Sequence, residues 1–210
     1  MTLELVEARR RRWRLYIALL AITLIITIPF SICIGSSPIP FEEGVKVLFK
    51  WLPINLYVDE SYEKIILVSR LPRVLMGCVV GAALSLAGAI LQGIFRNPMA
   101  DPYVIGVSSG AALGAALAIA LGIGFTVFGM ATISAMAFMM AMVSIVIVYN
   151  LSRVGGRTPT MTLLLSGIAV SIFFSAITTL ISTFASARLH GLYFWLLGSL
   201  SDAEWEHLLI

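Results

Sequence analysis

Long stretches without a charged residue limit what this chain can fold into more than any other feature of its sequence. A helix needs about 20 apolar residues to cross the hydrocarbon core of a bilayer. Four uncharged runs reach that length: Leu15–Gly35, Val74–Phe95, Pro102–Ser152 and Thr158–Ala187. A soluble enzyme or a nucleic-acid-binding domain would have to expose these runs to water. The sequence therefore predicts an all-α protein that crosses the membrane several times.

The third run, Pro102–Ser152, is too long for a single span. As one α-helix it would extend about 76 Å, whereas the hydrocarbon core is about 30 Å thick. We expect the chain to turn back near Gly122–Gly124, which gives a third span at Tyr103–Leu121 and a fourth at Phe125–Asn150. A fifth span follows Pro159 and ends near Phe184, so we predict a helical bundle of about five spans.

Small residues recur at every fourth position in the second and third predicted spans. Positions four apart lie above one another on a helix, so each span presents a stripe with almost no side chain. In a bilayer such stripes allow two backbones to approach closely, and plain helix packing is the simplest interpretation. We assign this packing to Gly77, Gly81, Gly93, Gly106, Gly110 and Gly114. Leucine at Gly81 or at Gly110 is predicted to abolish assembly or function.

Charge predicts how the chain is oriented in the cell membrane. The excess of 14 Lys and Arg over 11 Asp and Glu is concentrated in Arg9–Arg14, directly before the first span. This distribution is the positive-inside signal, which places the N-terminus in the cytoplasm, and it argues against nucleic acid as a partner. Residues 36–69 then form an extracytoplasmic segment, in which apolar positions from Phe41 to Leu52 predict a short amphipathic helix.

The residue types needed for catalysis or metal binding are absent from the spans. No Asp or Glu lies inside any of the five. Cys33 and Cys78 each stand alone in an apolar run, and His190 and His207 lack the spacing of metal ligands. We therefore predict no catalytic residue, no metal site and no cofactor on this chain.

Two polar breaks flank the second span, and each allows a purely structural interpretation. Before it lies Arg70-Leu71-Pro72-Arg73, where Pro72 suits the first turn of a helix and the arginines suit anchors at the membrane surface. After it lies the stretch Arg96–Pro102, in which Asp101 suits the N-cap of the next helix.

Three motifs lie in this region: RLPR at Arg70–Arg73, VGAALSLAGAILQGIFRNPMADP at Val80–Pro102 and IGVSSGAALGA at Ile105–Ala115. They resemble the FecCD family, the ABC importer permeases for iron-siderophore, haem and vitamin B12. Weaker similarities to this family follow at Leu163–Ser171 and Trp195–Trp205. The resemblance implies a bundle of the vitamin B12 importer permease type. Because family permeases have about ten spans, residues 1–210 are expected to be the N-terminal half of a single transmembrane permease domain.

The resemblance also implies partners and roles. A permease of this family pairs with a second copy, two ABC ATPase subunits that bind the ATP, and an extracytoplasmic binding protein, and it moves a metal chelate through the lipid bilayer by alternating access. Arg70 and Arg73 are implied to dock the binding protein. The cytoplasmic gate is implied to comprise Asn97, Pro98, Met99, Asp101, Thr160 and Met161. A non-transporting membrane scaffold or a passive channel fragment remains the alternative.

Overall fold

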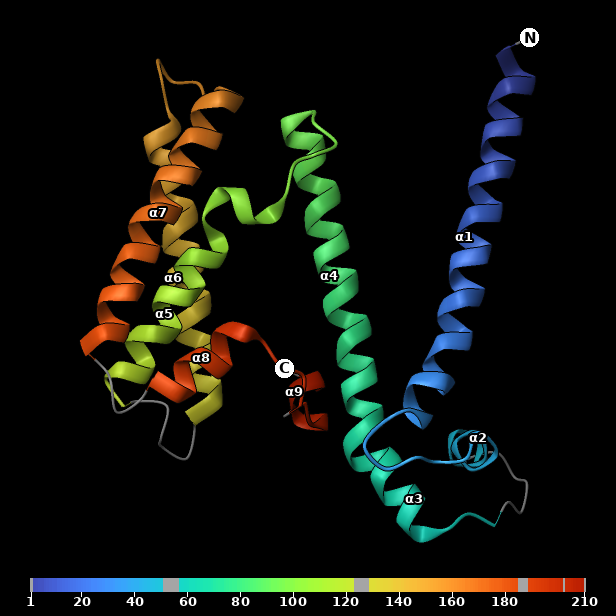
Figure 1. The fold of residues 1–210 in the computed structure, drawn as a ribbon. Coiled ribbons are helices and arrows are strands. Elements are labelled where there is room, and N and C mark those ends of the chain that lie inside the picture. The colour runs from blue at the N-terminus through green and yellow to red at the C-terminus, as the bar shows by residue number, and fades with distance from the viewer. Residues whose placement is uncertain (1, 51–56, 123–128, 185–188, 202, 210) are drawn as a thin grey trace. The chain divides into compact units, whose positions relative to one another are not determined.

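The computed structural model describes residues 2–50, 57–122, 129–184, 189–201 and 203–209 (Figure 1). Apart from turns and an isolated bridge between Val154 and Arg157, the regular structure within these ranges is helical. The chain forms two compact units. The first comprises Met1–Val80 with Leu200–Ile210, and the second comprises Gly81–Ser199.

Four helices of the described residues are long and apolar enough to cross a membrane. They are Val6–Cys33, Glu60–Phe95, Thr132–Ser152 and Thr160–Phe184. The expected third span, Tyr103–Leu121, is different: its α-helix, α5, covers only Val107–Ala120. Fourteen residues rise about 21 Å, less than the thickness of the hydrocarbon core. The helix cannot begin earlier because Gly106 has a φ of 81° and ends a separate 3₁₀ turn at Pro102–Ile105.

In the first unit, a long N-terminal helix meets a short one. Helix α1 (Thr2–Cys33) is followed by α2 (Phe41–Phe49), which confirms a short helix after the first span; the predicted end at Leu52 lies outside the described residues. A Cβ added to Gly44 would collide with the Cys33 sulfur, so α2 lies tightly against the end of α1. Lys46 pairs with Glu42 at 2.7 Å, and its ammonium group lowers the pKa of that carboxyl. The core of this unit contains Ile32, Ile39, Val47, Val58 and Ile66.

The helix of the second predicted span begins earlier than expected. Helix α3 (Glu60–Lys64) starts at Asp59, whose carboxylate accepts the Ser61 N–H at 2.8 Å. It continues through a π-helical turn at Ile65–Arg70 into α4 (Leu71–Phe95). Pro72 therefore lies inside a continuous helix and does not begin one. A proline ring clashes with the carbonyl four residues earlier in an α-helix, and the wider π-turn directly before it accommodates this.

In the second unit, α5, α6 (Gly129–Ser152) and α7 (Thr160–Phe184) run side by side (Figure 1). The predicted start of the fourth span at Phe125, and the turn beyond Gly122, lie outside the described residues. Helix α8 (Leu189–Leu197) is a short apolar helix that follows α7 in the chain. Its Leu192 is only 2% exposed and packs with Ala115, Ile119 and other core residues. A short helix, α9 (Trp205–Leu209), ends the described chain.

Candidate functional site

The two arginines of the RLPR motif line the same hollow in the first unit. This hollow has a volume of about 270 Å³, and its wall includes Ser31, Ser36 and Ser69 besides Arg70 and Arg73. The arginines come from the π-turn and from the first turn of α4, while the first two serines come from the end of α1 and the loop after it. Two guanidinium groups beside hydroxyl groups form a site that suits an anionic group. We call it the arginine hollow.

Arg70 is held firmly in this site. Its side chain is 8% exposed, and its Nη1 donates to the carbonyl oxygens of Ile32 at 2.7 Å and Cys33 at 3.0 Å. Its Nη2 donates to the carbonyl of Ser37. The first two carbonyls end α1, where helical carbonyls lack partners and a positive charge is favourable. Arg70 therefore caps α1 from a distance in sequence, and Gly35 leaves room for it, since a Cβ there would lie 2.8 Å from Nη2.

Arg73 is held less completely. Its Nε donates to the carbonyl of Leu200 at 3.1 Å and its Nη2 to the carbonyl of Ser201 at 2.7 Å. A guanidinium carries five N–H groups, and the side chain is exposed, so Arg73 retains donors for an incoming carboxylate. Within the arginine hollow, Arg70 supplies a fixed charge and Arg73 supplies the accessible donors.

The implied gate loop forms two capped turns. The Asn97 side chain accepts the Met99 N–H at 2.9 Å, and the Asp101 carboxylate accepts the Tyr103 N–H at 2.8 Å. The structural interpretation of Asp101 is confirmed, with the difference that it caps the 3₁₀ turn and not α5 itself. Asn97, Pro98 and Asp101 are exposed, and Met99 is 84% exposed.

The second implied gate segment lies at the same end of the second unit as the 3₁₀ turn. A Cβ on Gly167 of α7 would lie 3.0 Å from the Ile105 Cα, so the 3₁₀ turn packs against the N-terminal part of α7. Thr160 is the first residue of α7, and Met161 beside it is 71% exposed. The structure thus brings the two segments to one end, with exposed side chains in both.

The two glycine stripes have different surroundings. A Cβ on Gly110 would lie 2.8 Å from the Met140 carbonyl oxygen, and one on Gly114 would lie 2.9 Å from the Ala137 Cα, so α5 and α6 pack backbone to backbone. Ser144 strengthens this contact because its hydroxyl donates to the Gly106 carbonyl at 2.7 Å. Among the described residues, nothing lies within 4 Å of a Cβ on Gly81 or on Gly93, and Gly77 has only Leu200 nearby, at 3.7 Å.

Three residues with specific contacts were not identified from the sequence. Gly167 has no side chain and so lets the Val104 backbone pack against α7, and the Ser144 hydroxyl donates to the Gly106 carbonyl. Trp205 donates its indole N–H to the Leu67 carbonyl at 2.8 Å. For Gly167 and Trp205 a signal existed, since both lie within the weaker motifs. The described residues contain no group of three or more His, Cys, Asp and Glu side chains able to hold a metal ion.

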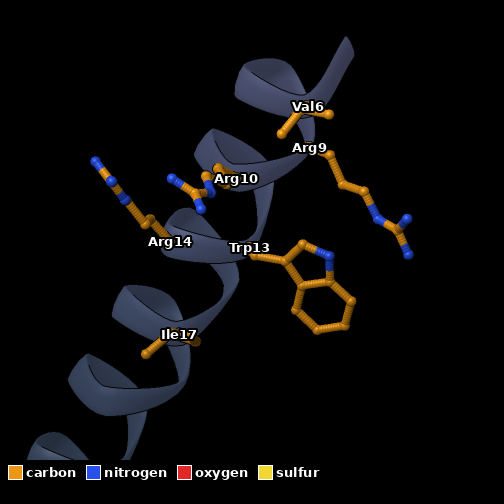
Figure 2. Close-up of a pocket in the computed structure, with 6 residues that line it drawn as sticks. All are labelled: Val6, Arg9, Arg10, Trp13, Arg14 and Ile17. Atoms are coloured by element: carbon orange, nitrogen blue, oxygen red, sulfur yellow. The ribbon is translucent and has the colours of Figure 1, made fainter. Parts of the chain in front are cut away.

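Basic side chains crowd the N-terminal part of α1. Figure 2 shows Arg10 and Arg14 projecting from one side of the helix and Arg9 and Trp13 from the other. All of these side chains are exposed, and the Trp13 ring meets Tyr16 edge-on at 6.4 Å. Arginines next to amphipathic aromatic rings are typical of a helix that passes through a membrane surface.

Comparison with known proteins gives consistent results. The cobalamin import permease BtuC of Halobacterium salinarum is 36% identical over 73% of this chain and 41% of its own length. The molybdate import permease MolB of Haemophilus influenzae is 35% identical over 90% of this chain and 55% of its own length. The Fe(3+)-citrate import permease YfmD of Bacillus subtilis is 32% identical over 94% of this chain and 56% of its own length. The chain thus spans about half the length of these relatives.

A solved structure and a family model agree with these relatives. The structure, a metal-chelate type ABC transporter in an inward-facing conformation, matches with a TM-score of 0.72 and 33% identity over 90% of this chain and 55% of its own. The all-α fold is therefore of the vitamin B12 importer permease type. The model of the FecCD transport family matches residues 23–210. The chain belongs to the FecCD transport family.

Proposed function

We propose that this chain forms the membrane-spanning part of an ABC importer that carries a metal chelate of the iron-siderophore, haem or cobalamin type into the cell. The match to the FecCD family over residues 23–210 carries this proposal. The cobalamin and Fe(3+)-citrate permeases among the relatives support this class of cargo. Because another relative is a molybdate permease, a metal oxyanion is included in the proposed range of cargo. The chain itself breaks no bond: a separate ATPase subunit binds and hydrolyses ATP.

The arginine hollow is the proposed docking point for the binding protein. A carboxylate of the partner would enter beside Arg73, which keeps exposed N–H groups, while the buried charge of Arg70 adds to the attraction. Such a contact orients the binding protein over the pathway and speeds the encounter, because opposite charges steer association.

Charge reversal at the accessible arginine tests this docking point. Arg73→Glu in the assembled transporter should weaken capture of the binding protein by about tenfold or more at low salt, and the difference from wild type should shrink as salt rises. Equilibrium binding of labelled binding protein at low and high salt measures both effects. The matched control is Arg96→Glu, in the loop on the other side of the second span. Equal affinity of wild type and Arg73→Glu at low salt would contradict the docking role.

We propose that the N-terminus and the gate loop Asn97–Asp101 face the cytoplasm. The exposed arginines of the N-terminal part of α1 support this orientation, because they suit the anionic lipid headgroups of the inner leaflet. Thr160 and Met161, at the start of α7, lie at the same end of the second unit as the gate loop, and they complete the proposed gate. A second copy of the permease forms the other half of the pathway. Alternating access would then open this end and the docking end in turn.

Accessibility labelling tests the orientation. Met99→Cys and Tyr57→Cys place thiols at positions that are 84% and 91% exposed. A membrane-impermeant maleimide added to intact cells should label Tyr57→Cys and spare Met99→Cys until the cells are opened. Labelling of Met99→Cys from outside, with Tyr57→Cys protected, would reverse the orientation and remove the proposed gate and docking point together.

A further inference from the structure

Pro72 leaves one carbonyl of the π-turn without a backbone donor. In this turn the Leu71 N–H donates to the carbonyl of Ile66, five residues earlier. The next bond in the same register would run from residue 72 to the carbonyl of Leu67, but proline has no N–H. The indole N–H of Trp205 donates to that carbonyl instead, at 2.8 Å. A side chain 138 positions along the chain thus supplies the hydrogen bond that the proline removes.

A second set of contacts holds the same segment. Arg73, one residue after the proline, donates to the carbonyls of Leu200 and Ser201. The Leu200 carbonyl also accepts the Ala203 N–H at 3.1 Å, and the Ala203 side chain is 9% exposed. The described residues of Leu200–Leu209 are therefore joined to the preceding helix at two places. Arg73, in the first turn of α4, donates to Leu200 and Ser201, and Trp205 donates to Leu67 in the π-turn.

We propose that Trp205 is a positioning residue for Arg73. By donating to the Leu67 carbonyl, Trp205 keeps its segment against the π-turn. The Leu200 and Ser201 carbonyls of that segment then hold the Arg73 guanidinium in the wall of the arginine hollow. Pro72 and Arg73 of the RLPR motif thus act together. Because Pro72 lacks an N–H, the Leu67 carbonyl is available to accept the Trp205 indole N–H. Arg73 in turn donates to the carbonyls of the segment that Trp205 holds in place. The docking consequence rests on the proposed function, whereas the attachment of the segment does not.

Thiol labelling at Ala203 measures the attachment directly. In full-length permease carrying Ala203→Cys, the maleimide reaction rate reports how often Leu200–Leu209 opens, after subtraction of the parent's reaction at Cys33 and Cys78. Trp205→Phe removes the N–H and keeps an aromatic ring, and should raise the rate about two- to tenfold, the range expected for one hydrogen bond. Trp13→Phe on α1 is the matched control and should leave the rate unchanged.

Pro72→Ala provides the decisive comparison. Alanine at 72 restores an N–H, and the Leu67 carbonyl gains a backbone donor whether the turn stays π-helical or becomes α-helical. Pro72→Ala alone should therefore raise the labelling rate, and adding Trp205→Phe to it should change the rate less than twofold. If Trp205→Phe raises the rate equally in both backgrounds, Trp205 only packs there and the proposal is wrong. It is also wrong if Trp205→Phe has no effect with Pro72 present.

Capture of the binding protein separates this proposal from the docking proposal. If both hold, Trp205→Phe weakens capture and Pro72→Ala/Trp205→Phe weakens it no further than either single change. If labelling follows the predicted pattern and capture is unchanged for every variant, including Arg73→Glu, the attachment stands and the docking role fails. If Arg73→Glu weakens capture and Trp205→Phe does not, Trp205 holds the segment without positioning Arg73.

Discussion

Gly114→Leu is expected to abolish accumulation of folded protein in the membrane. A Cβ at this position would lie 2.8 Å from the Met136 carbonyl carbon and 2.9 Å from the Ala137 Cα. Both are backbone atoms of α6, which cannot rotate away as a side chain does, so α5 and α6 would have to separate. Even Gly114→Ala should lower stability by about 3 kcal/mol, the upper range of overpacking costs. Membrane expression and thermal unfolding in detergent measure the two variants.

Gly81 offers a matched control on the other glycine stripe. The sequence predicted that leucine at Gly81 and leucine at Gly110 would be equally damaging, but among the described residues only Gly110 has a close neighbour. Gly81→Ala should therefore be neutral or stabilise its helix by up to about 1 kcal/mol, the difference in helix propensity. Wild-type stability in Gly114→Ala would contradict the close packing of α5 on α6. A loss in Gly81→Ala would show that a neighbour outside the described residues covers this stripe.

Arg70→Met is expected to destabilise the first unit by about 3 to 5 kcal/mol. The change removes three charge-assisted hydrogen bonds. The carbonyls of Ile32 and Ser37 lose this donor, the Cys33 carbonyl keeps only the Ile39 N–H at 3.4 Å, and buried groups left unpaired are costly. Arg73→Met should lower stability by only about 1 kcal/mol, because its side chain and both of its hydrogen bonds are exposed. Thermal unfolding of both variants in detergent gives the comparison.

An independent variant checks the same site without removing the arginine. Gly35→Ala places a Cβ 2.8 Å from the Arg70 Nη2. By displacing the guanidinium it should also destabilise the protein, as Arg70→Met does. If Arg70→Met is no more destabilising than Arg73→Met, Arg70 does not cap α1 and acts only at the surface.

Features set by local sequence could be predicted well. The uncharged runs predict the long helices because a bilayer demands about 20 apolar residues. The apolar pattern from Phe41 to Leu52 predicts a short helix, which the structure shows at Phe41–Phe49. The capping role of Asp101 follows from its own side chain and the proline after it. Each of these depends on residues within a few positions of one another.

Features set by long-range contacts could not be predicted in the same way. The shortening of the third span depends on the positive φ of Gly106, whose carbonyl is held by Ser144 on another helix. The donor to the Leu67 carbonyl in the π-turn before Pro72 is Trp205, which lies 138 positions later in the chain. Arg70 has the same sequence context as a surface anchor, and only the neighbouring end of α1 turns it into a buried cap.

Uptake into proteoliposomes is the most direct test of the importer assignment. Vesicles containing the full-length permease, its ATPase subunit and enclosed ATP are given the binding protein with ⁵⁵Fe(3+)-citrate, [⁵⁷Co]cobalamin or ⁹⁹Mo-molybdate outside. We expect one of these to accumulate inside only when both ATP and the binding protein are present, and Arg73→Glu to reduce the rate. Equal permeation without ATP would identify a passive channel, and no accumulation of any metal compound would contradict the importer assignment.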